Sequence, residues 1–96
     1  MNQNKQPKPN RLDIYRRRMK FSRRQVARLL GHQGIARISD YERGERLPGL
    51  VNALRLGIIL RVPVEFLFYS LHDSLRAQIR AEEERCGAQP IQGTLF

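Results

Sequence analysis

The chain has one cysteine and no long apolar run. The first excludes a disulfide-stabilised fold, and the second excludes a membrane-spanning protein. Because Cys86 is alone, no disulfide can form within the chain, and a thiolate metal site would need several more ligands. No apolar run approaches the ~20 residues that span a membrane. Residues 1–10 lack the apolar stretch of a signal peptide. We therefore expect a cytoplasmic protein with no membrane partner.

A catalytic residue set is also missing. His32 and His72 are isolated, with no cysteine or acidic cluster at metal-ligand spacing. The three glutamates at 82–84 form a charge run typical of a solvated helix face. The turn between Gly31 and Gly34 is too short for a phosphate-binding loop and lacks its lysine. The sequence therefore predicts no enzyme, no cofactor and no metal site.

Basic residues are abundant and concentrated at the start of the chain. The formal net charge is +9, and residues 1–30 contain ten basic side chains against one acid, Asp13. A localised positive field attracts polyanions, of which nucleic acid is the usual one. The alternative is a solubilising surface or a disordered basic arm. Charge alone leaves both interpretations open.

Apolar periodicity and capping residues predict six helices and no strand, in a single small domain. Residues 1–10 are expected to be a flexible basic arm, with Asn10 capping a first helix that runs to about residue 20. Ser22 and Gln25 form a capping-box pattern, and Gly31 is a good C-cap, so they bound a second helix. Further helices are expected at about 35–43, 50–60, 63–69 and 71–85, followed by a flexible tail over residues 86–96.

The apolar residues of these helices are expected to face one core. Ala27 is small where a second helix would cross closely. The positions predicted to face inward are Leu12, Ile14, Tyr15, Met19, Val26, Leu29, Leu30, Ile38, Tyr41, Leu50, Ala53, Leu54, Leu56, Gly57, Leu60, Val64 and Leu67.

Several short segments together resemble a known family. They are Phe21-Ser22, Val26-Ala27, Leu29-Leu30-Gly31, Ile38-Ser39, Tyr41-Glu42-Arg43-Gly44, Leu47-Pro48 and residues 61–68. In order and spacing they resemble the lambda-repressor/Cro-like (XRE-type) helix-turn-helix family. The resemblance implies an all-α fold, a five-helix DNA-binding domain over residues 11–70, and here an additional C-terminal helix over residues 71–85.

The resemblance also implies that the third helix enters the major groove of double-stranded DNA. Arg37 is the best candidate for a base reader, because a guanidinium pairs bidentately with guanine O6 and N7. A phosphate contact is the alternative for Arg37, and Asp40 either reads a base or faces away from the phosphates. The base-reading candidates are Gln33, Ile35, Ala36, Arg37, Ser39 and Asp40.

Phosphate contacts are implied for residues around the motif. The family pairs an arginine of its first helix with the glutamate of the Tyr-Glu-Arg-Gly segment, which corresponds here to Arg16 and Glu42. Arg23 stands where family members often have a glutamine that supports phosphate binding. The phosphate-binding candidates are Arg16, Ser22, Arg23, Arg24, Arg43 and Arg46.

The sequence departs from the family pattern at two places. Gly31 to Ile38 spans one residue more than the commonest spacing, which the turn is expected to absorb. Arg61 stands where many members have the glycine that ends the fourth helix, which weakens the expected C-cap without changing the fold.

The C-terminal region offers apolar residues that suggest a homodimer. Phe66 sits where the family usually has a polar residue, and an apolar stripe follows at spacings of four. The alternative is that the last helix folds back over its own core. The candidate dimer residues are Phe66, Tyr69, Leu71, Leu75 and Ile79.

Three functions fit these observations. The first is a sequence-specific transcriptional regulator, a repressor that binds a palindromic operator as a dimer. The second is an antitoxin-like or other protein-interaction module, in which the C-terminal region binds a protein partner and DNA binding is autoregulatory. The third is a basic helical domain that binds RNA or bridges proteins.

Overall fold

The computed structural model of the chain describes residues 10–87. The expected arm up to residue 9 and the expected tail from residue 88 lie outside the described residues. The described part is all-α, which confirms the predicted fold class, and it contains no strand. Its helices are α1 (Leu12–Arg18), α2 (Arg23–Leu30), α3 (Ala36–Arg43), α4 (Leu50–Leu60), α5 (Val64–Leu67) and α6 (Tyr69–Cys86).

Local chemistry explains the ends of α2. The Ser22 hydroxyl accepts from the Gln25 backbone N–H at 3.0 Å, and the Gln25 side chain accepts from the Ser22 N–H at 2.7 Å. This reciprocal pair confirms the predicted capping box. At the other end Gly31 takes the left-handed conformation at φ 83°, and His32 N–H donates to the Ala27 carbonyl. This Schellman motif stops the helix and turns the chain toward α3.

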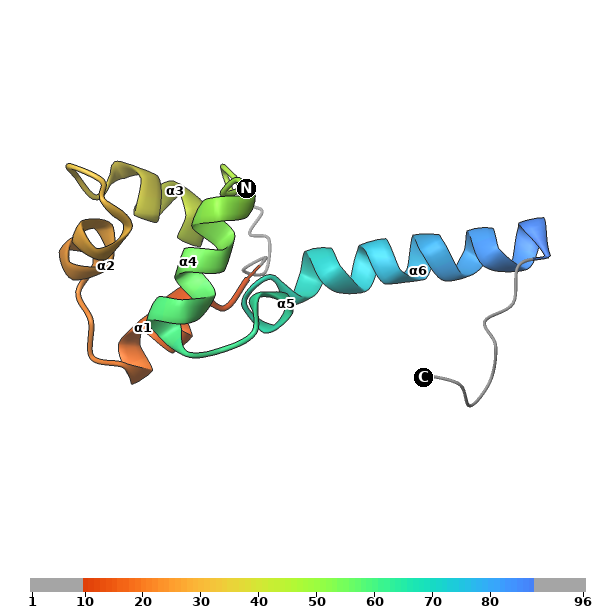
Figure 1. Cartoon of the computed structure of the whole chain (residues 1–96), viewed down its shortest axis with the longest axis horizontal. Coiled ribbons are helices and arrows are strands. Elements are labelled where there is room, and N and C mark those ends of the chain that lie inside the picture. Colours follow the sequence, from red (N-terminus) through yellow and green to blue (C-terminus); the bar gives the residue numbers. More distant parts are fainter. Residues whose placement is uncertain (1–9, 88–96) are drawn as a thin grey trace, which may run out of the picture.

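The hydrophobic core joins α1 through α5. Its fully buried side chains include Val26, Leu56 and Leu67, and Ala27 is small enough to be buried where α2 meets the core. Gly57 permits the close approach of the chain after α4, because a Cβ there would lie 3.0 Å from the Val62 carbonyl oxygen. The helices before α6 therefore form one packed body (Figure 1).

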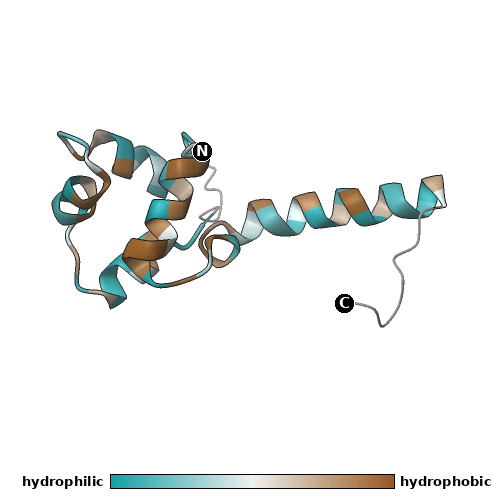
Figure 2. Ribbon diagram, in the orientation of Figure 1, coloured by the Kyte–Doolittle hydropathy of each residue, from teal (hydrophilic) through white to brown (hydrophobic). Residues whose placement is uncertain are grey.

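Four residues that were predicted to face this core are exposed instead. Ile14 is 44% exposed and Leu29 is 56% exposed, so these two predictions are wrong. Leu50 and Leu54 on α4 are likewise exposed, at 75% and 52%. The error on α4 has a physical cause: the helix is apolar nearly all round, so periodicity does not indicate its inward side (Figure 2).

The last two helices differ from the expected bounds. Pro63 caps α5 rather than lying inside it, and α5 has only four residues. The next helix, α6, starts at Tyr69, two residues earlier than expected, and continues for 18 residues. It extends away from the packed body (Figure 1), and none of its residues is buried. The structure therefore contradicts the alternative in which this helix folds back over its own core.

Candidate nucleic-acid interface

The second and third helices and their turn form a helix-turn-helix unit. The turn runs from Gly31 to Ile35, and α3 begins at Ala36. Gln33 and Ile35 therefore lie in the turn, just ahead of the helix, and the turn accommodates the extra residue of this sequence. Both side chains are exposed.

One face of α3 packs against the domain and leaves the other open. Ile38, Tyr41 and Glu42 are buried. On the outer side Ala36 and Arg37 are exposed, while Ser39 and Asp40 are half-buried. The structure thus brings the six base-reading candidates to one side of the turn and the first part of α3.

Arg37 supplies a positive charge on this face. It makes no hydrogen bond or ion pair with any described residue. Arg37 lines the same hollow as His32 in the turn, which is half-buried and whose Nδ1 has no hydrogen-bond partner among the described residues. Burial lowers the pKa of His32, and the charges of Arg37 and Arg55 lower it further. His32 is therefore neutral at pH 7, and the positive charge at this edge belongs to the arginines.

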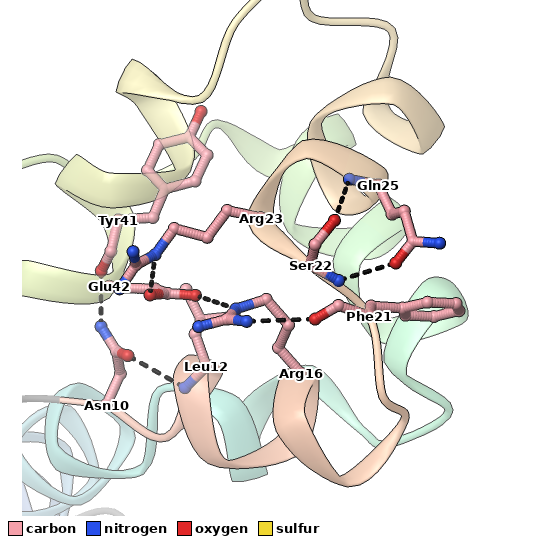
Figure 3. Close-up of polar contacts among 9 residues, drawn as sticks. All are labelled: Asn10, Leu12, Arg16, Phe21, Ser22, Arg23, Gln25, Tyr41 and Glu42. Carbon is pink, nitrogen blue, oxygen red and sulfur yellow. Dashed lines mark hydrogen bonds and ion pairs between the residues drawn. The ribbon is translucent and has the colours of Figure 1, made fainter.

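Glu42 anchors α3 to both helices that precede it (Figure 3). Arg16 Nε on α1 donates to Glu42 Oε2 at 2.6 Å, and Arg23 Nε on α2 donates to Glu42 Oε1 at 2.9 Å. Arg16 also donates through Nη1 to the Phe21 carbonyl at 3.0 Å. The Glu42 side chain is 3% exposed. A buried carboxylate needs charged hydrogen-bond donors, and here each oxygen has one.

Asn10 makes a second link between α1 and α3 (Figure 3). Its Nδ2 donates to the Tyr41 carbonyl at 2.8 Å, and its Oδ1 accepts from the Leu12 backbone N–H at 3.0 Å. Asn10 is buried, so it belongs to the folded domain rather than to the arm where the sequence boundary placed it. The sequence revealed the capping role, but only the fold brings Tyr41 within reach.

Asp40 forms ion pairs with Arg43, the last residue of α3, and with Arg46 beyond the helix. Arg43 Nη2 lies 2.8 Å from Asp40 Oδ1, and Arg46 Nε lies 3.7 Å from Asp40 Oδ2. Arg43 also contacts Glu45 at 3.2 Å. All four side chains are at least partly exposed, so solvent screens these pairs. They are weak enough for a phosphate to compete for the arginines.

The phosphate-binding candidates differ in how free they are. Arg16 is buried in the Glu42 cluster, whereas the Arg23 side chain is 44% exposed and has one side toward solvent. Arg24 is exposed and makes no hydrogen bond or ion pair with described residues. The Ser22 hydroxyl accepts its capping hydrogen bond.

The Arg23–Glu42 contact was not predicted from the sequence. Arg23 was a phosphate-binding candidate, because it stands where family members often have a glutamine that supports phosphate binding. Arg23 and Glu42 are 19 positions apart, and no spacing rule connects residues on two crossing helices. One signal could have indicated the contact. Glu42 falls on the inward side of its helix, where a carboxylate needs cationic partners, and the two preceding helices carry arginines.

A comparison with family models adds an independent finding. A helix-turn-helix family model matches residues 12–67, which run from the first turn of α1 to the end of α5. The chain belongs to this helix-turn-helix family. The match confirms the lambda-repressor-like, XRE-type resemblance, and it covers the Glu42 cluster and the open face of α3. A search of curated proteins finds no matching sequence.

Membership of this family assigns the chain a general activity. The family consists of DNA-binding transcription regulators and is not typically enzymatic. The helix-turn-helix domain of this chain is therefore a DNA-binding regulator domain. The match ends at residue 67, so α6 is an addition to the family domain.

Within residues 10–87 no helix combines the length and apolar character needed to cross a membrane. The same residues contain no group of three histidine, cysteine or acidic side chains placed to hold a metal ion.

Proposed function

We propose that this protein is a sequence-specific transcriptional repressor that binds a palindromic operator in double-stranded DNA as a homodimer. The observation that carries the proposal is the free guanidinium of Arg37 on the open side of α3, a helix held by Glu42 on its other side. A guanidinium that is not engaged within the protein can pair with guanine O6 and N7. A rigid helix keeps that pairing in register.

The surrounding residues take supporting roles in this proposal. Gln33, Ile35, Ala36 and Ser39 contact base edges or the thymine methyl group beside Arg37. Arg24, the exposed side of Arg23, and Arg43 and Arg46 contact phosphates, and Arg16 acts mainly by holding Glu42. Asp40 pairs with Arg43 and Arg46 in the absence of DNA, and phosphate oxygens replace it when DNA binds. Phosphate contacts position the helix, and base contacts select the sequence.

Selection of binding sites from random duplex DNA by the full chain tests the proposal. We expect a two-fold symmetric consensus, with half-sites about 10 base pairs apart, because a two-fold dimer presents two copies of α3. Arg37→Ala is expected to relax the preference at one base pair of each half-site by about 1–3 kcal/mol. The consensus placed over a reporter promoter should lower expression when the protein is present.

Arg24→Ala is the matched control, because Arg24 is equally free but lies on α2. It is expected to weaken binding to all duplexes by a similar factor and to leave the consensus unchanged. Equal behaviour of the two variants would show that Arg37 is a phosphate contact. Absence of any enriched sequence would overturn the proposal.

A further inference from the structure

An apolar groove lies between α6 and the body of the domain. Its volume is about 460 Å³, and its walls include Leu47 and Ala53 on one side and Phe68, Leu71 and Leu75 on the other. Leu47 and Leu75 are 60% and 46% exposed, so the groove is open to solvent. Open apolar walls of this kind mark interaction sites in soluble proteins.

The rest of α6 is also unpartnered. Leu71, Leu75 and Ile79 lie one turn apart along the same side of the helix, and all three are exposed. The helix has 18 residues and is about 27 Å long, and it stands away from the body (Figure 1). A helix takes most of its stability from packing of its apolar face, so α6 needs a surface to pack against.

No element within residues 10–87 covers this stripe. Leu71 and Leu75, the first part of the stripe, line the groove. A different apolar segment is therefore needed to fill it. A second α6 running antiparallel to the first supplies the occupant, because its own stripe faces back toward the groove. In such a two-fold arrangement each copy fills the groove of the other.

Charge favours a second copy in this orientation. Residues 10–68 contain 13 basic and 5 acidic side chains, whereas α6 contains 3 basic and 4 acidic ones. Three of those acids, at 82–84, lie near the free end of α6, where Arg80 and Arg85 pair with two of them and leave a net charge of −1 over residues 80–86. An antiparallel partner brings this acidic end to the basic body of the other copy, where Arg46 precedes Leu47. Opposite charges on the two surfaces favour this pairing over a parallel one.

We propose that a second copy of this chain occupies the groove, with its α6 antiparallel to the first and Leu75 close to the two-fold axis. This proposal deepens the proposed function, since it rests on the homodimer and names the surface that forms it. It also divides the residues that the sequence offered for dimerisation. Leu71, Leu75 and Ile79 belong to the interface.

Phe66 and Tyr69 lie outside the proposed interface. Neither residue lines the groove. Tyr69 is half-buried, with the Arg11 guanidinium 4.1 Å above its ring, and it precedes Leu71 by two positions, which places it on another side of the helix. Phe66 lies on α5 and is 52% exposed, so it marks an alternative dimer surface that the experiments below can distinguish from the groove.

Sedimentation equilibrium of the full chain tests the interface. The wild type is expected to be a dimer at micromolar concentration. Leu75→Glu is expected to raise the dimer dissociation constant by about a hundredfold or more, because two leucines are lost and two carboxylates face each other. Ala77→Glu is the matched control: it adds the same charge to the same helix on the side away from the stripe, and it should leave the dimer intact. Circular dichroism checks that all variants remain helical.

Cross-linking tests the orientation. In a Cys86→Ser background, which has no other cysteine, Leu75→Cys is expected to form a disulfide-linked dimer under a mild oxidant. Ile79→Cys in the same background should remain monomeric on a denaturing gel, because in the antiparallel pair it faces position 71 of the other copy, whereas in a parallel pair it would face position 79 of the other copy. Cross-linking of both variants to the same extent would indicate a parallel pair and would overturn the orientation.

Three results would overturn the interface. One is a wild type that sediments as a monomer at tens of micromolar. Another is a dimer that Leu75→Glu leaves intact and Phe66→Glu dissociates. The last is a monomer that purifies with a different protein, whose binding Leu75→Glu abolishes. Binding of the same variants to duplex DNA separates this inference from the proposed function: loss of the dimer in Leu75→Glu together with no DNA binding by the wild type would leave the interface supported and the repressor proposal wrong.

Discussion

At the scale of single residues, Glu42 determines how α3 is held. Its two oxygens accept from arginines of two different helices, and its side chain is almost fully buried. A buried charge pair adds little stability compared with apolar packing, but removing one partner leaves the other charge without compensation. In this domain two guanidinium groups would be left together. The cluster therefore fixes the position of the proposed DNA-reading helix relative to α1 and α2.

We expect Glu42→Gln to lower the free energy of unfolding by about 3 kcal/mol, since it removes the buried anion and points an amide donor at a guanidinium. Binding to duplex DNA should weaken in the same variant, because α3 loses its anchor. Urea denaturation measures the first effect, and titration of a labelled duplex measures the second. Glu45→Gln is the control, because Glu45 is exposed and its one ion pair within residues 10–87 is with Arg43; its effect should stay within about 0.5 kcal/mol. Full stability of Glu42→Gln would contradict this role for the cluster.

At the scale of helices, α4 ends in a way that glycine usually permits. Arg61 takes the left-handed conformation at φ 59°, at the position where the family often has glycine. A side chain in this region crowds its own carbonyl oxygen and costs about 1–2 kcal/mol. The C-cap, which the missing glycine was expected to weaken, is thus formed by arginine, and α4 still ends at Leu60.

Arg61→Gly is expected to raise the free energy of unfolding by about 1 kcal/mol, because relief of the strain exceeds the added entropy of the unfolded chain. Arg55→Gly is the matched control, since it makes the same substitution in the interior of α4, where glycine destabilises by about 1 kcal/mol. Urea denaturation of both variants should therefore show shifts of opposite sign. A destabilised Arg61→Gly variant would mean that the Arg61 side chain contributes more than its backbone strain costs.

At the scale of the whole molecule, charge and shape divide the chain into two parts. The packed body carries the positive charge and the family domain, and α6 carries an apolar stripe and an acidic end. If each copy neutralises about four phosphates through Arg23, Arg24, Arg43 and Arg46, a dimer makes about eight such contacts.

The logarithm of the DNA affinity is then expected to fall with the logarithm of salt concentration at a slope of about −7. Arg24→Ala removes one contact per copy and should reduce the slope by about 2. Arg76→Ala, on α6, should leave the slope unchanged, because α6 lies away from the helix-turn-helix unit (Figure 1). Fluorescence anisotropy over a salt series makes the measurement, and a slope shallower than about −2 would contradict the phosphate assignment.

Much of the fold was predictable because its signals are local. The capping box at Ser22 and Gln25, the left-handed Gly31 and the buried pair Ile38 and Tyr41 all follow from short-range patterns that the structure confirms. The exposed side of α4 was not predictable, because Leu50 and Leu54 are as apolar as the residues that face the core. In the candidate site, the sequence indicated the face that carries Arg37. It did not reveal that Arg23 contacts Glu42 or that Asp40 contacts Arg43 and Arg46.

By itself the sequence determined the helical class, the positions of the helices and the family, because capping, periodicity and motif order depend on neighbours along the chain. Only the tertiary structure decided how residues far apart in sequence meet. It placed Asn10 on Tyr41 and gave Glu42 two arginine partners. It also left α6 standing away from the core, where the sequence allowed both a folded-back and a projecting helix. An apolar stripe shows that a helix has a side to bury, but only the arrangement of the other helices determines whether its own domain has room to cover it.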